Sequence, residues 1–418
     1  MKTKAVRLHG VEDLRIDEYE LPEITEDEIL ARVVTDSLCL SSYKAAKLAT
    51  EHKRVPSDIA ERPIIIGHEF CGEIVKVGSR WSDKFKAGQK FTVQPAINYK
   101  GSLAAGGYSY TYFGGDATYI IIPVEAMIMD CVFVYNGNDY FGGSLSEPLS
   151  CVAGTFHAMY HIDQGKYEHH MGIKEGGNMA LLAGVGPMGL AAIDYILACD
   201  RRPSKLVVTD IDDARLERAA KILSPEKAAA RGVELKYLNT AKCEDACGEL
   251  MAFSGGQGYD DVVVFAAVAP VVEQADKILA VDGCLNFFAG PADPNFSAKL
   301  NFFNVHYSRT HIVGTTGGNS EDMKEVLDMV GEGKLDPAIL VTHIGGLDCV
   351  PETTLNLPHI PGGKKLIYTG IQLPLTAIAD FRSLGEADRR FARLADITEA
   401  NNGLWCEAAE KYLLENFN

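Results

Sequence analysis

The chain of 418 residues is longer than one ordinary hydrophobic core requires, so its length predicts two domains. A formal net charge of -17 argues against nucleic acids and anionic membranes as partners. The 10 cysteines form no C-x-x-C pair, a usage typical of a reducing compartment, and the start MKTKAVRLHG lacks the apolar core of a signal peptide. No apolar run approaches the roughly 18 residues of a membrane span. We therefore expect a cytoplasmic protein.

Up to about residue 150 the sequence predicts a compact β unit. Short runs rich in Val, Ile, Thr and Tyr, such as EILARVVTDS, GEIVKVG and ATYIIIP, are separated by clusters of Gly, Pro, Asp and Lys. This pattern is typical of strands that pair over long distances in the chain. We expect residues 1–152 to form one domain, to which residues 338–370 return with further short strands.

Residues 153–337 show a different pattern, in which apolar strands alternate with helices. Strands are predicted at NMALLAG, KLVVTD and DDVVVFAA, and helices at GPMGLAAIDYILACD, DDARLERAAKIL and PVVEQADKILA. This alternation indicates a parallel, doubly wound sheet, so the chain belongs to the α/β class. The strand GCLNFFAG and the segment after it are candidates for pairing across a subunit interface. Residues 371–418 predict a helical extension that covers a cleft, extends an interface or caps the β domain.

A candidate dinucleotide loop follows the strand NMALLAG. Gly184, Gly186 and Gly189 form the motif G-x-G-x-x-G, with Pro187 and Met188 between the last two glycines. Gly184 would permit a tight turn and Gly186 the approach of a pyrophosphate to the helix N-terminus, while Gly189 would allow close packing of helix and strand. The alternative is a glycine-rich turn without a ligand. The strand before the motif and the helix after it favour dinucleotide binding.

The next predicted strand, KLVVTD, ends at Asp210, and Arg215 lies in the helix that follows. A carboxylate at this place can accept hydrogen bonds from the adenosine ribose, and it would repel a 2′-phosphate. We therefore predict NAD rather than NADP. The predicted cofactor-binding residues are Gly184, Gly186, Pro187, Met188, Gly189, Asp210 and Arg215.

Three separate stretches carry residues of the kinds that bind zinc. Cys39 lies in DSLCLSSYK, His68 and Glu69 follow the apolar run PIII, and Glu147 lies in GSLSEPLSCVAG. A catalytic zinc uses three such ligands and keeps one position open. Each residue also has another explanation. Cys39 could be a buried thiol, the His68-Glu69 pair a polar turn, and Glu147 a charge near a helix N-terminus.

These motifs, in this order, resemble the zinc-dependent medium-chain dehydrogenase/reductase family, and within it the polyol (sorbitol-type) dehydrogenase branch. The family signature G-H-E-x2-G-x5-G-x2-V corresponds to residues 67–81, with Trp81 in place of the final Val. The stretches GGDATYIIIP, SEPLSCVAGTFHA, VVTD and EGKLDPAILVTH resemble further segments of the family. The likeness extends over about residues 1–370.

The resemblance implies a GroES-like β domain and a Rossmann domain, with the active site in the cleft between them. It implies that Cys39, His68 and Glu147 hold one catalytic zinc. Glu69 would ligate the metal in some states or lie beside it, and Ser41 corresponds to a hydroxyl of the family's proton relay. The implied reaction is hydride transfer between NAD(H) and the secondary alcohol or ketone of a polyol or ketose.

Three departures from the family pattern matter. Residues 95–116 contain no cysteine, whereas many members bind a structural zinc there through four, so we expect none in this chain. Ser42 stands where an aspartate usually supports the ligand histidine, and Asp36 is a candidate substitute. Lys44 replaces the histidine at the outer end of the proton relay, so the sequence does not assign the path by which the proton leaves.

A basic cluster follows the zinc cysteine in YKAAKLATEHKRVP. Lys44, Lys47, Lys53 and Arg54 could bind a substrate phosphate in a chain that is acidic elsewhere. The alternative is a solvated helix face followed by an exposed loop. The SSYK stretch, the chain length and the missing cysteines resemble ketose-1-phosphate (sorbose-phosphate type) reductases of this family. A sugar phosphate is therefore a candidate substrate beside the free polyol or ketose.

Two other functions compete with this interpretation. A zinc-free NADPH-dependent quinone or enone reductase would share the fold, but it would lack the Cys/His/Glu set. A non-catalytic nucleotide-binding protein would keep the fold without turnover. The intact ligand set argues against both, and Asp210 argues against NADPH. Members of the family are commonly dimeric or tetrameric, so we expect a homodimer or homotetramer with a small-molecule substrate.

Overall fold

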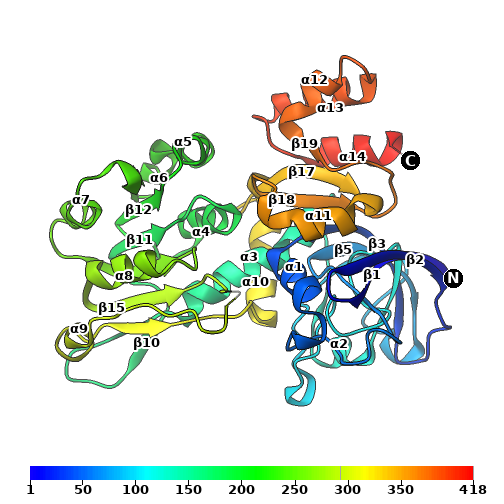
Figure 1. Cartoon of the computed structure of the whole chain (residues 1–418), viewed down its shortest axis with the longest axis horizontal. Helices are drawn as coiled ribbons and strands as arrows, with labels where there is room; N and C mark the ends of the chain where they lie inside the picture. Colours follow the sequence, from blue (N-terminus) through cyan, green and yellow to red (C-terminus); the bar gives the residue numbers. More distant parts are fainter. Residues whose placement is uncertain (292, 418) are drawn as a thin grey trace. The chain divides into compact units, whose positions relative to one another are not determined.

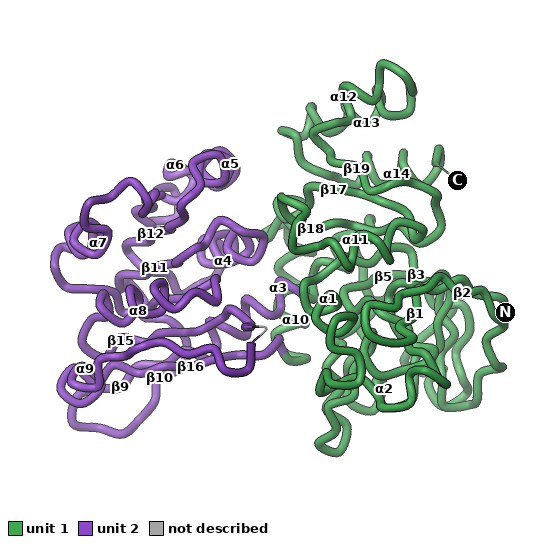
Figure 2. Tube along the Cα trace, in the orientation of Figure 1, with its two compact units in different colours: residues 1–147, 319–418 green, residues 148–318 purple. Residues whose placement is uncertain are grey.

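The computed structural model describes residues 1–291 and 293–417 (Figure 1). The chain forms two compact units, unit 1 with residues 1–147 and 319–418 and unit 2 with residues 148–318 (Figure 2). In the described part of the chain, no helix has the length and apolar character needed to cross a bilayer.

Unit 1 begins with a three-stranded antiparallel sheet of β2 (Asp13–Glu20), β1 (Lys2–Gly10) and β4 (Ile64–Ile65). Its larger sheet runs in the order β19 (Thr376–Ala377), β17 (Val341–Gly346), β18 (Lys364–Tyr368), β3 (Ile29–Leu38), β5 (Phe70–Val77), β6 (Lys90–Val93) and β8 (Val132–Val134), and β7 (Tyr119–Ile122) also pairs with β3. The helices of unit 1 include α1 (Leu40–Leu48), α2 (Val124–Ile128), α10 (Ser320–Gly331), α11 (Val350–Asn356), α12 (Phe381–Leu384), α13 (Arg389–Ala400) and α14 (Glu407–Asn416).

Strand β3 is a central strand of the larger sheet. It pairs antiparallel with β18 along one side and with β5 and β7 along the other. Ile29, Ala31 and Val33 alternate toward one buried cluster, which also contains Phe70 and Phe91. This alternation is the pattern expected of a strand with one face in the core. The C-terminal end of β3 is consequently held rigidly, and it leads directly into α1.

Unit 2 is a six-stranded parallel sheet with helices between its strands, which confirms the predicted α/β fold class. Its strands, in spatial order, are β13 (Glu234–Asn239), β12 (Lys205–Asp210), β11 (Asn178–Leu182), β14 (Tyr259–Val264), β15 (Leu279–Phe287) and β16 (His311–Val313). Its other elements are β9 (Tyr160–Ile162), β10 (His169–Met171), α4 (Pro187–Ala198), α5 (Asp213–Ile222), α6 (Pro225–Ala229), α7 (Ala246–Phe253), α8 (Ala269–Ile278) and α9 (Phe302–Tyr307). Most of GCLNFFAG lies in β15, which β14 and β16 already flank, so this segment is inside the sheet.

The division of the chain differs from the predicted domain boundaries near residue 337. Helix α10 belongs to unit 1, not to the Rossmann part. Its residues Met323, Val326 and Met329 are buried, and its first residue, Ser320, has its hydroxyl 3.8 Å from the sulfur of Cys131 in unit 1. The long helix α3 (Phe141–Ala158) crosses the first boundary, between residues 147 and 148.

The C-terminal extension packs on unit 1. Its strand β19 pairs antiparallel with β17 and so lengthens the larger sheet, as Figure 1 shows. Trp405 is fully buried, its indole N–H donates to the hydroxyl of Tyr368 in β18 at 2.8 Å, and its ring lies beside that of Phe381. The extension therefore shares a core with the sheet that carries the candidate metal ligands.

Candidate active site

Cys39 lies at the junction between β3 and α1. Strand β3 ends at Leu38 and helix α1 begins at Leu40, so Cys39 directly precedes the helix with an extended backbone, φ −122° and ψ 144°. Its side chain is partly exposed, and its sulfur accepts a hydrogen bond from the hydroxyl of Ser41 at 2.9 Å. Since β3 is held on both sides, the sulfur has a defined position at the end of the strand.

His68 and Glu69 directly precede β5, and a glycine sets the turn that presents them. Gly67 has φ +87°, and a Cβ there would lie 2.2 Å from Oδ2 of Asp36 and 2.6 Å from the backbone nitrogen of Asp116. Only glycine fits such a position. Both side chains after it are buried, with exposed fractions of 4% for His68 and 1% for Glu69.

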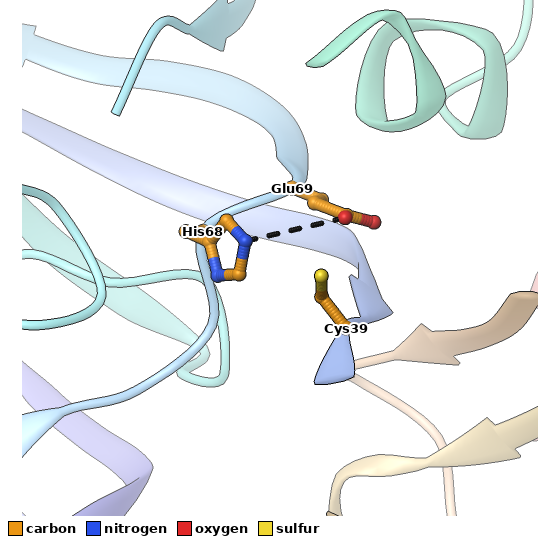
Figure 3. A group of neighbouring side chains, drawn as sticks. All are labelled: Cys39, His68 and Glu69. Atoms are coloured by element: carbon orange, nitrogen blue, oxygen red, sulfur yellow. Dashed lines mark ion pairs between the residues drawn. The ribbon is translucent and has the colours of Figure 1, made fainter. Parts of the chain in front are cut away.

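Cys39, His68 and Glu69 form a compact metal-binding group. One ligand atom from each residue lies within 4.8 Å of the other two, and Figure 3 shows the three side chains turned toward one another. The imidazole Nε2 of His68 is 4.0 Å from Oε1 of Glu69. A thiolate, an imidazole and a carboxylate are the donors that zinc prefers in catalytic sites, so this group fits zinc.

Hydroxyl groups surround the imidazole of His68. Nδ1 lies 3.2 Å from the hydroxyl of Ser42, and Nε2 lies 3.2 Å from the hydroxyls of Ser41 and Tyr108. Ser42 thus supports the histidine at the place where the family pattern has an aspartate, so the support that seemed lost is present as a hydroxyl. The candidate substitute, Asp36, instead accepts a hydrogen bond from the backbone N–H of Glu69 at 2.9 Å.

Glu69 takes part in a buried ion pair. The ammonium of Lys364 in β18 lies 2.5 Å from Oε1 and 2.6 Å from Oε2 of Glu69, and the hydroxyl of Ser37 donates to Oε2. Burial lowers the pKa of Lys364, but the charges of Glu69 and Cys39 outweigh it and hold the pKa above its ordinary value. Lys364 is therefore a cation, and it balances the charge of Glu69 in an interior where an isolated charge would be costly.

Two further carboxyl groups, Asp36 and Asp116, are fully buried beside Gly67, the residue before His68. Burial raises the pKa of Asp36 well above its usual range, and the neighbouring carboxyl of Asp116 adds to this effect. Burial raises the pKa of Asp116 to about 7. A shared proton between the two would remove most of the cost of burying both groups.

Glu147 lies in α3, close to the metal-binding group but outside the set whose ligand atoms meet within 4.8 Å. Burial raises its pKa to about 8; His68 opposes this effect, while Glu69 and Cys39 add to it. The structure therefore brings Cys39 and His68 together with Glu69. Glu147 is near enough for all three residues to influence its pKa. The two glutamates and the thiol together carry more negative charge than the nearby cations balance. A divalent cation bound here would supply the missing positive charge.

The nucleotide loop lies in unit 2, between β11 and α4. Gly186 is the residue before the helix, and Pro187 and Met188 form its first turn. A Cβ at Gly189 would lie 2.1 Å from the carbonyl oxygen of Gly184, so the strand–helix turn is as tight as side-chain-free backbone allows. Pro187 has no N–H group, so Met188 and Gly189 supply the first N–H groups of α4, at a half-buried helix N-terminus of the kind that binds anions.

Asp210 is the last residue of β12 and lies at the same end of the parallel sheet as the loop. Its Oδ1 accepts hydrogen bonds from the backbone N–H groups of Ile211 and Asp212, at 2.9 and 3.2 Å. The guanidinium of Arg215 lies 3.6 Å from Oδ1 of Asp210, and a Cβ at Gly186 would lie 3.4 Å from this guanidinium. The predicted cofactor residues therefore lie around one sheet edge.

The four basic residues after Cys39 are not equivalent. Lys44 is half-buried in α1, and burial lowers its pKa while the charge of Cys39 opposes this. Lys47 is exposed and donates to the hydroxyl of Tyr43 at 3.2 Å. Lys53 is exposed, and Arg54 donates to the carbonyl oxygen of Leu103 at 2.8 Å. Of the four, Lys44 is the one whose charge interacts with the candidate zinc ligand Cys39.

Ser42, Tyr108 and Lys364 belong to the site but were not predicted from the sequence. Lys364 had a signal, because two consecutive lysines open the otherwise apolar strand KKLIY. Ser42 had one too, since it occupies the family's aspartate position. Tyr108 had none, because it is one of several tyrosines in a glycine-rich loop and only the folded chain brings it to His68.

Comparisons with known proteins identify the family of the chain. The alcohol dehydrogenase GroES-like domain family matches residues 25–130, and the zinc-binding dehydrogenase family matches residues 187–332. The chain is 51% identical over 417 residues to mannitol-1-phosphate 5-dehydrogenase of Aliivibrio fischeri, covering 100% of this chain and 98% of the relative. It is 47% identical over 412 residues to L-sorbose 1-phosphate reductase of Klebsiella pneumoniae, covering 99% and 97%.

Solved structures show the same fold. The crystal structure of 2R,3R-butanediol dehydrogenase from Bacillus subtilis superposes with a TM-score of 0.69 and 21% identity, covering 88% of this chain and all of that one. The two family matches lie in the order of the two predicted domains, and the two relatives match the chain over nearly its full length. The chain therefore belongs to the zinc-dependent medium-chain dehydrogenase/reductase family, in its polyol dehydrogenase branch.

Proposed function

We propose that this protein transfers a hydride between NAD(H) and a polyol phosphate or ketose phosphate, with one zinc ion per chain. The observation that carries the proposal is the meeting of Cys39, His68 and Glu69 in a buried group, in a chain that also has a dinucleotide loop. The phosphate is suggested by the names of the two full-length relatives, each of which specifies a sugar phosphate.

Cys39 and His68 would hold the zinc together with a carboxylate. Glu69 already pairs with Lys364, which favours Glu147 as the third ligand and leaves Glu69 as a carboxylate beside the metal. Zinc, when bound, acts as a Lewis acid on the substrate oxygen. No group of cysteines is present in residues 95–116, so we propose a single metal.

The chain's own hydroxyl groups would handle the proton of the substrate alcohol. Ser41 lies between the sulfur of Cys39 and Nε2 of His68, and its Oγ can accept a proton while passing on its own. Tyr108 contacts the same imidazole nitrogen, and burial raises its pKa well above the ordinary value, so it stays a hydrogen-bond donor at neutral pH. Hydride transfer itself belongs to the cofactor, while the protein contributes positioning.

NAD is the proposed cofactor rather than NADP. Asp210 is held by two backbone N–H groups at the end of β12, so its carboxylate is fixed where the adenosine ribose would bind. Arg215 lies next to it, with a guanidinium that can also attract a 2′-phosphate. The ratio of kcat/KM for NADH to that for NADPH decides between the two cofactors.

Lys44 is the proposed phosphate-binding residue with most support. It is half-buried, and its charge reaches both Cys39 and His52. The ring of His52, four residues after the end of α1, stacks on that of Tyr108, with centroids 5.7 Å apart and planes at 11°. Tyr108 in turn contacts His68, so this segment lies beside the metal-binding group. Lys53 and Arg54 follow His52, and their charges also act on it.

Lys47 has less support as a phosphate ligand and provides a matched control. Replacing Lys44 with Met should lower kcat/KM for a ketose 1-phosphate by about 10- to 100-fold, because a hydrogen bond to a charged group contributes about 1.5–3 kcal/mol. The same change at Lys47 should leave it within about twofold, as for an exposed surface charge. Equal losses in both variants would mean that the effect comes from net charge and not from a phosphate site.

The first experiment combines metal analysis with substrate tests. Zinc per chain is measured in freshly purified, unchelated protein, and NADH oxidation is followed with fructose, sorbose and their 1-phosphates. One zinc with activity on the phosphate esters alone supports the full proposal. Activity on the free sugars would keep the enzyme class and remove the phosphate.

The same experiment tests two other functions. NADPH-dependent reduction of a quinone or enone by zinc-free protein would identify a reductase that uses the fold without the metal. Absence of both zinc and turnover would leave a non-catalytic nucleotide-binding protein. The buried metal-binding group favours neither, because such a cluster of charges is costly to keep without a function.

A homodimer or homotetramer is the proposed assembly. Strand β16 forms the edge of the sheet in unit 2, and Phe302, Phe303 and Tyr307 of the preceding helix are exposed, as is Ile312 of β16. A sheet edge to which the described residues add no further strand, beside exposed apolar side chains, favours pairing with a second copy. Light scattering of the wild type and of a variant with charged residues at 302 and 303 would test this.

A further inference from the structure

One buried carboxylate of the C-terminal extension contacts the start of helix α3. Glu410 of α14 has an exposed fraction of 2%. Its Oε2 accepts a hydrogen bond from the backbone N–H of Tyr140 at 2.6 Å, and its Oε1 accepts one from the N–H of Phe141 at 3.0 Å. Phe141 is the first residue of α3, and Tyr140 directly precedes it.

Helix α3 depends on such a partner. The first N–H groups of a helix have no acceptor inside it, and buried ones must find a partner elsewhere. Asp139 serves the N–H of Gly142 at 3.1 Å, and Glu410 serves the two N–H groups before it. The helix opens with FGGSLSEP, whose two glycines and proline make a weak first half on their own. A carboxylate at this end also complements the helix dipole.

The same first half of α3 reaches the metal-binding group. Ser144 donates its hydroxyl hydrogen to the carbonyl oxygen of Glu69, and Thr92 of β6 donates to the carbonyl oxygen of Gly143 at 2.8 Å. Glu147, the proposed third zinc ligand, lies less than one turn beyond Ser144. A shift of the first turn of α3 would therefore move Glu147 and release the backbone of Glu69.

Aromatic side chains hold Glu410 in place. The hydroxyl of Tyr368 donates to Oε1 of Glu410 at 2.8 Å, and this hydroxyl accepts the indole N–H of Trp405 at 2.8 Å. Tyr368 and Trp405 are both fully buried. Glu410 is thus held by its own helix α14 and by the hydroxyl of Tyr368 in β18. A solvent-exposed capping residue would lack the second contact.

We infer that Glu410 is a positioning residue, through which the C-terminal extension fixes the start of α3 and with it Glu147 and Glu69. The inference rests on the proposed zinc function, since it assigns Glu147 to the metal. It gives the extension a role at the active site, beyond closing the edge of the sheet with β19.

The test replaces Glu410 with Gln in the full chain. Glutamine keeps the size, but it presents an NH2 group to one of the two backbone N–H donors. We expect zinc affinity, measured by competition with a chelator, to fall by about 10-fold or more, and kcat to fall similarly, as for residues that orient metal ligands. The Kd for NADH should not change. Glu410→Asp should recover part of the loss because it restores a carboxylate.

Glu407→Gln is the matched control, because Glu407 is an exposed glutamate one turn earlier in the same helix. It should leave both zinc affinity and kcat unchanged. A Glu410→Gln variant with a lowered Tm but wild-type zinc affinity and kcat would overturn the inference, since Glu410 would then only stabilise the fold.

Tyr368→Phe covers the case in which Glu410→Gln does not fold. It removes the hydroxyl that orients Glu410 and keeps both helix contacts, so it should weaken zinc binding in the same direction by a smaller factor. Unchanged zinc affinity in this variant would equally overturn the inference. If the wild type itself binds no zinc, the proposed function has failed, which differs from wild-type zinc binding that is insensitive to Glu410.

Discussion

The nucleotide loop of unit 2 and the metal-binding group of unit 1 are built in opposite ways. The loop is one contiguous segment, residues 184–189, between a strand and the helix that follows it. The metal-binding group joins Cys39 to His68 and Glu69, and Lys364 reaches Glu69 from a position 295 residues further along the chain.

The two regions differ in how strongly they depend on the rest of the fold. The loop works through backbone geometry, which its own glycines supply. The metal-binding group works through charged side chains in a buried place, so its members need strands β3, β5 and β18 side by side. We therefore expect variants of the loop to have local effects, and variants of the metal-binding group to affect both catalysis and stability.

The largest expected effect is that of Cys39→Ser. Loss of the thiolate should remove a Lewis-acid contribution of several kcal/mol, so kcat should fall by about 1,000-fold or more. The Kd for NADH, measured by fluorescence titration, should stay near that of the wild type, because the loop lies in unit 2. Cys243→Ser, a half-buried cysteine of unit 2, is the control. Wild-type turnover in Cys39→Ser would remove Cys39 from the metal site.

Lys364→Met should have the next largest effect, on stability. It leaves Glu69 buried without its counter-charge, so the free energy of unfolding should fall by about 3–5 kcal/mol, measured by urea denaturation of metal-free protein. Lys365→Met is the neighbouring control, because the ammonium of Lys365 donates to the backbone carbonyl oxygens of Ile360, Pro361 and Gly363 and not to Glu69.

A double variant sharpens this prediction. Glu69→Gln combined with Lys364→Met removes both charges, so it should be more stable than the sum of the two single losses implies. Simple addition of the two losses would show that the ion pair does not stabilise the metal-binding group.

Gly189→Ala should disturb the loop by a smaller amount. The new Cβ would lie 2.1 Å from the carbonyl oxygen of Gly184, so helix α4 must shift, at a cost of about 1–3 kcal/mol. The Kd for NADH should rise by about 10-fold or more, whereas zinc content should stay unchanged. Gly331→Ala is the control, since a Cβ there meets no atom within 4 Å. A parallel loss of zinc would contradict the local character of the loop.

Asp210→Ser should have the smallest effect, on cofactor choice. Removing the carboxylate should shift the ratio of kcat/KM for NADPH to that for NADH by about tenfold, or 1.4 kcal/mol, toward NADPH. Asp213→Ser, an exposed aspartate three residues later, should leave the ratio unchanged. An unchanged ratio in Asp210→Ser would place cofactor selection elsewhere, with Arg215 as the next residue to test.

Much of the fold was predictable because its signals are local. The alternation of apolar strands and helices indicated the parallel sheet of unit 2, and the motif at residues 184–189 indicated its dinucleotide loop. The pairing of β18 with β3 was not readable in the same way, because the two strands are separated by hundreds of residues and pair by shape and burial alone. The assignment of α10 to unit 1 likewise depends on which surface its buried face meets.

The amino-acid sequence was sufficient to propose the kinds of residue at the candidate active site, and their order along the chain. Ligand chemistry is a property of side chains, and the glycines of the loop restrict their own backbone. Tertiary structure alone decided that Glu69 meets Cys39 and His68 while pairing with Lys364, that Ser42 supports His68, and that Glu410 caps the helix of Glu147. The partners of a buried charge depend on which strands pack around it. The pairing of strands that are distant in the sequence cannot be predicted from local sequence patterns.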